Sequence, residues 1–179
     1  MAQREIGLSI GEPPTTRGYP PSVFARLPGL VERAGMGPAG RGSITAFYTV
    51  LTEGDDQQEP IADAARAILD GHIVLDRRIA DSGLYPAIDI ERSVSRVVTE
   101  IADLATRERI RRLKRLMAAY SAQRDLIAIG AYQRGADPLV DEAIARWPAI
   151  QAFLGQDVHE GASLESSKAA LAQLLEGSP

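Results

Sequence analysis

The first part of the chain has apolar positions at helical spacing, interrupted by segments rich in glycine and proline. Residues 1–8 are typical of a short helix, and residues 23–31 place apolar side chains on one helical face. Ser22 is a candidate N-cap for this second helix, because a serine hydroxyl accepts from the first free N–H groups. Pro28 is expected to bend the helix or to split it, since proline removes a helical hydrogen bond.

A β-branched and aromatic run at residues 43–51 stands between two glycines. A nearly continuous apolar run of this length predicts a central strand that is buried on both faces. The acidic segment 53–56 follows the carboxyl end of this run. In open α/β sheets that edge is where ligand sites are usually built, so the segment lies in a favourable place for function.

A second short strand and two helices follow the acidic segment. Residues 61–69 and 77–82 predict helices on either side of a strand at residues 72–75. The order of elements up to Val98 is then helix, strand, helix, strand, helix. Two strands cannot form an independently stable parallel sheet that is covered on both faces. This region therefore has the pattern of part of an α/β domain.

From residue 99 onward the apolar spacing is helical throughout. Thr99 or Thr106 is the expected N-cap of a long helix that reaches residue 129, and Arg134-Gly135 is its expected end. No strand pattern interrupts this region.

Two further helices complete the helical region. Asp137 followed by Pro138 has the pattern of an N-cap and an N1 proline, and Ser163 is the expected cap of the last helix. The sequence thus predicts a partial α/β region at residues 1–98 and an all-helical bundle at residues 99–179.

The composition narrows the possible chemistry. The 179 residues include no cysteine, 45% hydrophobic residues, and 20 Lys and Arg against 24 Asp and Glu. The absence of cysteine excludes disulfides, thiolate zinc sites, iron–sulfur clusters and cysteine nucleophiles. A net charge of −4 argues against bulk nucleic-acid binding, and no apolar run approaches the roughly 18 residues that cross a bilayer. We therefore expect a soluble, cytoplasmic protein. His72, at the start of a predicted strand, is expected to be structural, because one isolated histidine cannot form a metal site.

One loop allows both a structural and a functional interpretation. Residues 11–21 contain four prolines and two glycines, which exclude regular structure and make the loop stiff. The loop is either a surface linker or a rigid frame that presents Glu12, Arg17 and Tyr19.

A cluster of positive charge also allows two interpretations. Its six cations are Arg107, Arg109, Arg111, Arg112, Lys114 and Arg115. The favoured interpretation is a solvated helix face that is partly paired with Glu108, because such runs usually face water. The alternative is a docking surface for an acidic partner.

Several motifs, in order along the chain, resemble the catalytic domain of the flagellar and type III secretion export ATPases, which are homologous to the catalytic subunits of rotary ATP synthases. The motifs lie at residues 2–8, 11–15, 18–24, 42–51, 53–56, 70–75, 85–89, 93–97, 125–132 and 151–154. Residues 47–51 followed by 53–56 favour the export branch. The resemblance implies α/β plus all-α architecture: part of a RecA-like P-loop NTPase domain at 1–98, then a helical C-terminal domain.

The resemblance implies ATP and Mg²⁺ as cofactors, bound between neighbouring subunits of a ring. These residues contain no G-x-x-x-x-G-K-[ST] motif, which cradles the phosphates. They also lack the Walker B aspartate and the catalytic glutamate that the family places upstream. Both cofactors then require the missing N-terminal half, and the chain by itself is expected not to hydrolyse ATP.

The resemblance assigns roles to individual residues as well. Arg96 matches the arginine finger that reaches the adjacent subunit's nucleotide, where an always-protonated guanidinium stabilises charge on the transferred phosphoryl group. Tyr85 matches the tyrosine that packs against adenine. Tyr132 and Gln133 are expected to close the other side of the adenine pocket.

Four further polar residues have less specific expectations. Glu12 and Arg17 are expected near the subunit interface, with no chemical step assigned to either. Asp55 and Asp56 are expected at the interface or near the metal, and capping of the following helix is an equally good interpretation.

The implied function is that of an ATP hydrolase and translocase that energises flagellar or type III protein export. The implied partners are identical subunits in a homohexamer, export chaperones and substrates, a central stalk protein, and the export gate at the inner face of the bacterial membrane, with no nucleic acid. One alternative is a stand-alone interaction module that binds chaperones or intact ATPase subunits without catalysis. Another is a fragment of an ATP synthase catalytic subunit.

Overall fold

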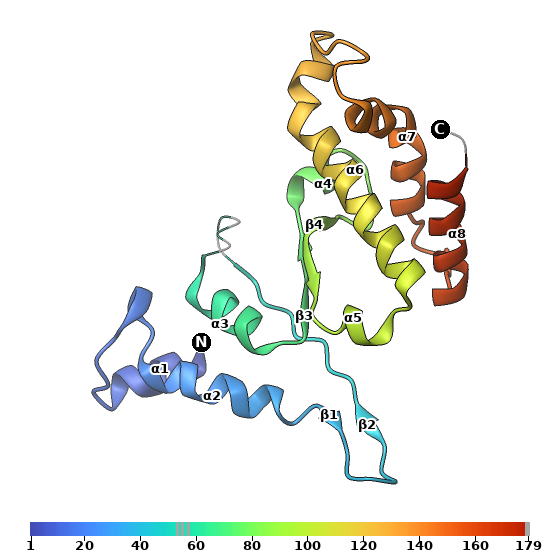
Figure 1. Ribbon diagram of the computed structural model, residues 1–179. Coiled ribbons are helices and arrows are strands. Elements are labelled where there is room, and N and C mark those ends of the chain that lie inside the picture. The colour runs from blue at the N-terminus through green and yellow to red at the C-terminus, as the bar shows by residue number, and fades with distance from the viewer. Residues whose placement is uncertain (53, 55, 57, 178–179) are drawn as a thin grey trace. The chain divides into compact units, whose positions relative to one another are not determined.

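The protein is described here from a computed structural model (Figure 1), which covers residues 1–52, 54, 56 and 58–177. Contacts divide the chain into two compact units, Met1–Asp70 and Gly71–Pro179. The second unit begins at Gly71 because the β-hairpin that starts there packs on a helix later in the chain. The division at residue 98 refers to the domains of the family and stays a prediction.

The first unit consists mainly of three helices in contact along the chain, and the sequence predicts each of these helices but not their contacts. Its elements are α1 (Ala2–Ser9), the 3-10 turn η1 (Thr16–Gly18), α2 (Pro21–Val31), β1 (Gly35–Met36), β2 (Ser43–Ile44) and α3 (Pro60–Ile68). Helix α2 contacts both α1 and α3. It begins at Pro21 with Pro20 as its N-cap, so the predicted cap Ser22 is wrong by two positions. A proline suits the first helical position because its φ is already helical. The helix continues through Pro28 without splitting.

The predicted buried strand at residues 43–51 is wrong. Only Ser43–Ile44 pairs, antiparallel to Gly35–Met36, and the side chains of Phe47 and Leu51 are 88% and 89% exposed. A strand needs neighbours that satisfy its N–H and C=O groups. Among the residues that the structure describes, the run has such a neighbour only at its first two positions.

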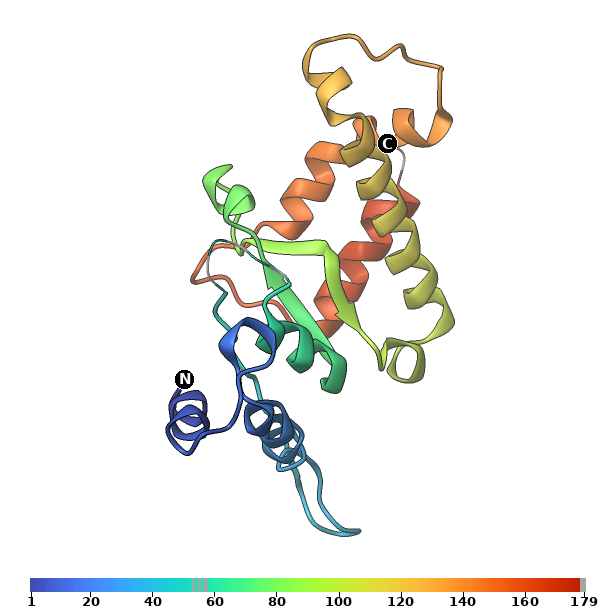
Figure 2. The ribbon, with the colours of Figure 1, turned by 90° about the vertical axis from the view of Figure 1, so that its left-hand side faces the viewer.

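The second unit combines a β-hairpin with helices (Figure 2). Its elements are β3 (Gly71–Leu75), α4 (Arg77–Asp81), β4 (Ile88–Ser95), α5 (Val98–Ile101), α6 (Leu104–Ala128), α7 (Pro138–Leu154) and α8 (Leu164–Glu176). The predicted strand and helix at residues 72–82 are confirmed, whereas β4 has no counterpart in the sequence prediction. Strands β3 and β4 are antiparallel, with an irregularity between His72 and Val74.

The caps of the last three helices are local side-chain contacts. Asp103, and neither Thr99 nor Thr106, caps α6, because its carboxylate accepts both the N–H and the hydroxyl of Thr106 at 2.8 Å. The caps of α7 and α8 are confirmed, since Asp137 accepts from Leu139 N–H and Ser163 from Ser166 N–H. Helix α6 ends at Ala128, before the predicted Arg134-Gly135.

Helices α6, α7 and α8 pack on one another around the core of the second unit (Figures 1 and 2). Leu116, Ile150 and Leu175, one from each helix, are at most 1% exposed. The rings of Tyr120 and Trp147 stack beside this core, 3.8 Å apart and nearly parallel. Within the described ranges, no helix has the length and apolar character that crossing a membrane requires.

A buried arginine joins the middle of α7 to the C-terminal end of α8. Arg146 of α7 is 7% exposed and donates to the carbonyl oxygens of Leu174 and Gly177 at 2.6 and 2.8 Å. Its Nε also donates to Glu142, which accepts in addition from Arg112 of α6 at 2.6 Å. Burial raises the pKa of Glu142, but the hydrogen bonds from Arg112 and Arg146 outweigh this, so its pKa lies below the ordinary value.

The first prediction concerns this network. Glu142→Gln should lower the free energy of unfolding at neutral pH by about 2 kcal/mol, because Arg146 stays buried without its carboxylate. A carboxylate with a depressed pKa stabilises the fold above its unfolded pKa, near 4.5, and loses this effect as the pH falls through the folded pKa. The difference between wild type and variant should therefore shrink in acid, as measured by urea unfolding at a series of pH values.

Glu108→Gln is the matched control, since Glu108 is exposed on α6 and has no ion pair among the described residues. It should change the free energy of unfolding by less than about 0.5 kcal/mol. A stability difference for Glu142→Gln that stays constant down to strongly acid pH would contradict the proposed charge network.

The connection between α6 and α7 is tied to the first turn of α7. The hydroxyl of Tyr132 donates to a carboxylate oxygen of Asp141 at 3.1 Å and to the carbonyl oxygen of Asp137 at 3.2 Å. The other carboxylate oxygen of Asp141 accepts the N–H of Gly135 at 2.8 Å, and Gly135 has a φ of +91° that favours glycine. Burial and the hydrogen bond to Asp141 raise the pKa of Tyr132.

The second prediction follows from that raised pKa. The part of the tyrosinate absorbance that is lost in Tyr132→Phe belongs to Tyr132. This signal should titrate with a pKa above the ordinary value of 10.0. Asp141→Asn should move this titration to lower pH, because the variant removes the negative charge that opposes ionisation of the phenol. The measurement is a spectrophotometric pH titration of each variant. A Tyr132 signal that does not move in Asp141→Asn would refute the contact.

Candidate functional site

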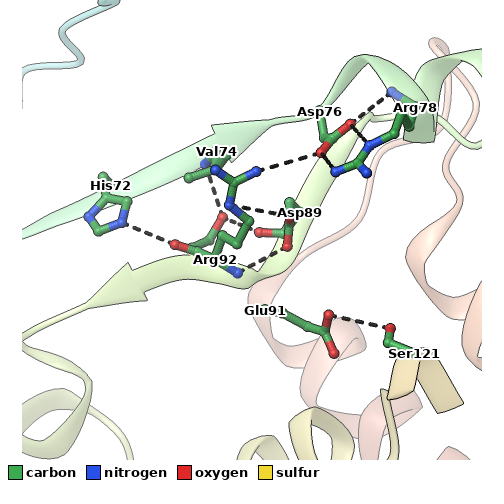
Figure 3. Close-up of polar contacts among 9 residues, drawn as sticks. His72, Val74, Asp76, Arg78, Asp89, Glu91, Arg92 and Ser121 are labelled. Carbon is green, nitrogen blue, oxygen red and sulfur yellow. Dashed lines mark hydrogen bonds and ion pairs between the residues drawn. The ribbon is translucent and has the colours of Figure 1, made fainter. Parts of the chain in front are cut away.

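Polar contacts hold the two strands of the hairpin together (Figure 3). The N–H of Arg92 donates to Asp89 at 2.9 Å, and its guanidinium forms an ion pair with Asp76 at 3.7 Å. Hydrogen bonds from the side chain and backbone of Arg78 hold the pKa of Asp76 below its ordinary value. The hydroxyl of Ser93 donates to the carbonyl oxygen of Asp89 and accepts the N–H of Val74. The ends of β4 are therefore well positioned.

His72 takes part in the same hairpin. Its Nε2 lies 3.1 Å from the carbonyl oxygen of Arg92, as Figure 3 shows. This contact agrees with the expectation that His72 is structural. Among the described residues, no group of three or more His, Asp or Glu side chains is arranged to hold a metal ion.

Arg96 directly follows the last residue of β4. Its side chain is exposed, between the strand and the short helix α5. The preceding backbone is fixed from outside the hairpin, because the ammonium of Lys114 on α6 donates to the carbonyl oxygen of Ser93 at 2.9 Å. The guanidinium of Arg96 is thus presented at the surface of the unit by a well-anchored strand.

Tyr85 comes before the other end of β4, and its side chain is 56% exposed. Its carbonyl oxygen accepts the N–H of Gln156 at 2.8 Å, and the Tyr85–Pro86 bond is cis. A Cβ added to Gly155 would lie 3.3 Å from Cδ1 of Leu84, so the loop after α7 approaches this segment closely. Tyr85 therefore offers an aromatic face beside the start of that loop.

Tyr132 and Gln133 lie at the opposite end of α7 from the loop that contacts Tyr85. Helix α7 has 17 residues, which corresponds to a length of roughly 25 Å. The structure thus brings Tyr85 together with Gly155 and Gln156, and not with Tyr132 and Gln133. Sequence reasoning missed Gly155 and Gln156, although they directly follow a family-like motif at residues 151–154.

The remaining candidates lie in the first unit. Arg17, in the left-handed backbone region with a φ of +50°, forms an ion pair with Asp56. This hydrogen bond from Arg17 lowers the pKa of Asp56. Glu12 accepts the N–H of Ser22 at 3.2 Å.

The candidate capping role of the acidic segment can be judged for Asp56 alone, since Asp55 is outside the described residues. Asp56 accepts the N–H of Gln58, whereas the N-cap of α3 is Glu59, which accepts from Ile61 and Ala62. The expected helix capping by Asp56 is therefore wrong. Its contact with Arg17 instead ties the proline-rich loop to the acidic segment.

Two family models match the chain in succession. Residues 1–95 match the nucleotide-binding domain of the ATP synthase alpha/beta family. Residues 102–173 match the T3SS EscN ATPase C-terminal domain.

Individual relatives agree with these matches. The flagellum-specific ATP synthase of Salmonella typhimurium is 62% identical over 96% of the chain and 38% of its own length. The assembled ATPase EscN of enteropathogenic E. coli matches with a TM-score of 0.91 and 45% identity, over 97% of this chain and 42% of that one. EscN in complex with its central stalk EscO matches with a TM-score of 0.83 and 44% identity, over 97% and 40% of the respective chains.

The chain spans about two fifths of the length of these relatives. The two models follow each other in the order that the motifs predict, and the fold of the relatives extends over nearly the whole chain. The predicted resemblance and fold class are therefore confirmed. The chain belongs to the ATP synthase alpha/beta family, and the relatives that it matches over nearly its whole length are flagellar and type III secretion ATPases.

Proposed function

We propose that this chain contributes to two neighbouring nucleotide sites in a homohexameric ATPase that energises flagellar or type III protein export. The placement of Arg96 and Tyr85 carries the proposal. They flank opposite ends of β4, whose first residue Ile88 pairs with Leu75 and whose last residue Ser95 pairs with Gly71 at the other end of β3. By the resemblance, Tyr85 packs against adenine and Arg96 reaches the nucleotide of the adjacent subunit, so in this proposal the two residues serve different sites.

Arg96 supplies positive charge to the site of the adjacent subunit. A guanidinium stays protonated at physiological pH, and its planar fork matches the oxygens over which the transferred phosphoryl group spreads its charge. The exposed position of Arg96 supports this role, because a residue that acts on a neighbour must lie at the surface of its own chain. The anchoring of Ser93 by Lys114 restricts the strand that carries it.

Tyr85 supplies a stacking face for the adenine base. Its exposed ring offers contact area, and the nearby Gly155 and Gln156 are in a position to border the same base. The hydroxyl of Tyr132 is already bonded to Asp141 and Asp137, so Tyr132 shapes the connection between α6 and α7.

ATP and Mg²⁺ are the cofactors of this proposal. The exposed aromatic face of Tyr85 and the cation of Arg96 fit a nucleotide, which carries both a base and phosphates. Neither a phosphate-binding motif in the sequence nor a metal-binding cluster among the described residues accompanies them. When bound, the metal neutralises phosphate charge, but the residues of this chain contribute through the base and the arginine.

A second candidate function is an interaction module without catalysis. The core that α6, α7 and α8 form among themselves favours it, because such a unit can present a binding surface without a nucleotide site. One relative was solved with its central stalk, and we propose a stalk, export chaperones and substrates, and the membrane export gate as partners of this protein at the cytoplasmic face of the membrane. Co-purification with an intact subunit in the absence of ATP turnover would favour this function.

The third prediction tests Arg96 in an ATPase that contains this chain. The chain replaces the matching segment of the Salmonella flagellum-specific ATP synthase, to which it is 62% identical, and ATP hydrolysis by the assembled chimera is measured. Arg96→Ala should lower kcat by about 10³-fold or more, because charge on the phosphoryl group loses its partner. Arg96→Lys should restore little, since an ammonium does not reproduce the planar fork.

Arg124→Ala is the control for the loss of one exposed positive charge, since Arg124 is 69% exposed on α6. It should leave kcat within about twofold. Assembly is checked by size-exclusion chromatography for each variant. An assembled Arg96→Ala chimera that keeps most of its turnover would refute the assignment.

The fourth prediction concerns Tyr85 in the same chimera. Tyr85→Ala should weaken ATP binding roughly tenfold, because an aromatic ring stacked on a base contributes about 1–3 kcal/mol. Tyr85→Phe should bind like wild type, since it keeps the ring. Equilibrium binding of a fluorescent ATP analogue measures the effect, and kcat at saturating ATP should change little. Equal binding by Tyr85→Ala and Tyr85→Phe would exclude a stacking role.

A further inference from the structure

The six cations near the start of α6 divide into two sets. Three of them form ion pairs or hydrogen bonds with other elements of the second unit. Arg109 pairs with Glu176 of α8 and Arg112 with Glu142 of α7, both at 2.6 Å, and Lys114 donates to the carbonyl oxygen of Ser93. These three side chains therefore join α6 to its neighbours.

The other three cations form a row that we call the arginine stripe: Arg107, Arg111 and Arg115. They recur at intervals of four residues, so they lie on one face of the helix. In the part of the chain that the structure describes, none of the three has an ion pair. The predicted pairing with Glu108 does not form in the described ranges either: Glu108 is exposed without an ion pair, and Arg112, four residues away, pairs with Glu142.

The contacts of the arginine stripe leave its charge uncompensated. Arg107 donates to the carbonyl oxygen of Thr99 at 3.2 Å, and Arg111 to that of Arg107 at 3.5 Å. The Nε of Arg107 is buried without an acceptor, which leaves the guanidinium with unused hydrogen-bonding capacity. Like charges four residues apart destabilise a helix, so an anionic partner on this face would be favourable.

A shallow cavity adjoins the arginine stripe. It has a volume of about 240 Å³ and is lined by Val98, Thr99, Arg107, Ile110 and Arg111. Apolar and cationic side chains thus meet in one hollow. Ile101 and Leu104, whose apolar side chains are exposed, lie along the chain between the lining residues Thr99 and Arg107.

We propose that the arginine stripe and its cavity bind an acidic, amphipathic helix of a partner protein. Carboxylates four residues apart on such a helix would have the same spacing as the arginines, and an apolar side chain between them would fill the cavity. The apolar lining disfavours a phosphate backbone, and the net charge of −4 disfavours bulk nucleic-acid binding. Neither Arg96 nor Tyr85 lines this surface, so its binding role does not depend on the nucleotide role.

The test uses the whole chain and a labelled synthetic peptide helix with three glutamates at four-residue spacing and leucines beside them. Fluorescence anisotropy measures binding to wild type and to the double variant Arg111→Gln/Arg115→Gln. The double variant should bind roughly tenfold more weakly, since it loses two charge contacts at a partly apolar surface. The same peptide with glutamine in place of glutamate should bind weakly to both proteins, and added salt should weaken the glutamate peptide.

Arg124→Gln/Arg134→Gln is the matched control, because it removes the same charge from exposed positions outside the arginine stripe. It should bind the peptide like wild type. Neither double variant removes an ion pair that joins two helices, so thermal unfolding followed by circular dichroism should show the same midpoint for all three proteins. Equal loss of binding in both double variants would overturn the proposal, as would equal binding of the glutamine peptide.

Three further arms distinguish other occupants. Duplex DNA and vesicles containing phosphatidylserine should bind more weakly than the peptide and without dependence on the arginine stripe. Tighter, stripe-dependent binding of either would replace the acidic helix with that polyanion. Sedimentation velocity should show the same self-association for wild type and the stripe variant, and a loss of self-association in the variant would identify a second copy as the occupant instead.

Discussion

The packing of β4 against α6 is the constraint on which the arrangement of the candidate site depends. Ile90 of β4 packs against the helical core, and Lys114 of α6 donates to the backbone at Ser93. Because both ends of β4 extend from this anchored segment, the helices determine where Arg96 and Tyr85 lie. The core of α6, α7 and α8 therefore contributes to the proposed function indirectly, by fixing a strand whose own sheet has only two members in the described structure.

The charges on α6 show how one helix serves two purposes. The arginines on the face toward α7 and α8 meet Glu142 and Glu176, and the buried Arg146 completes this network at the carbonyl oxygens that end α8. The opposite set forms no ion pair among the described residues. The helix geometry, which places every fourth residue on one face, separates a structural set of cations from one that is available for binding.

Much of this could be predicted from the sequence where the interactions are local. Asp137 and Ser163 cap their helices through contacts two or three residues away, so their residue types and positions were sufficient. Strand β4 was missed because its sequence mixes charged and apolar residues, and its pairing with β3 involves residues well apart in the chain. The run at residues 43–51 was misjudged for the converse reason, since strong β-propensity produces a strand only where a neighbouring strand is present.

The sequence by itself determined the family, most of the helices with the caps of α7 and α8, and the presence of Arg96 and Tyr85 without a phosphate-binding motif. Only the tertiary structure decided that Gln156, and not Tyr132, lies beside Tyr85, and which cations of α6 are paired. The physical reason is distance along the chain. A cap or a motif is a property of neighbouring residues, whereas the contact of Arg109 with Glu176 joins residues 67 positions apart and exists only once three helices have packed.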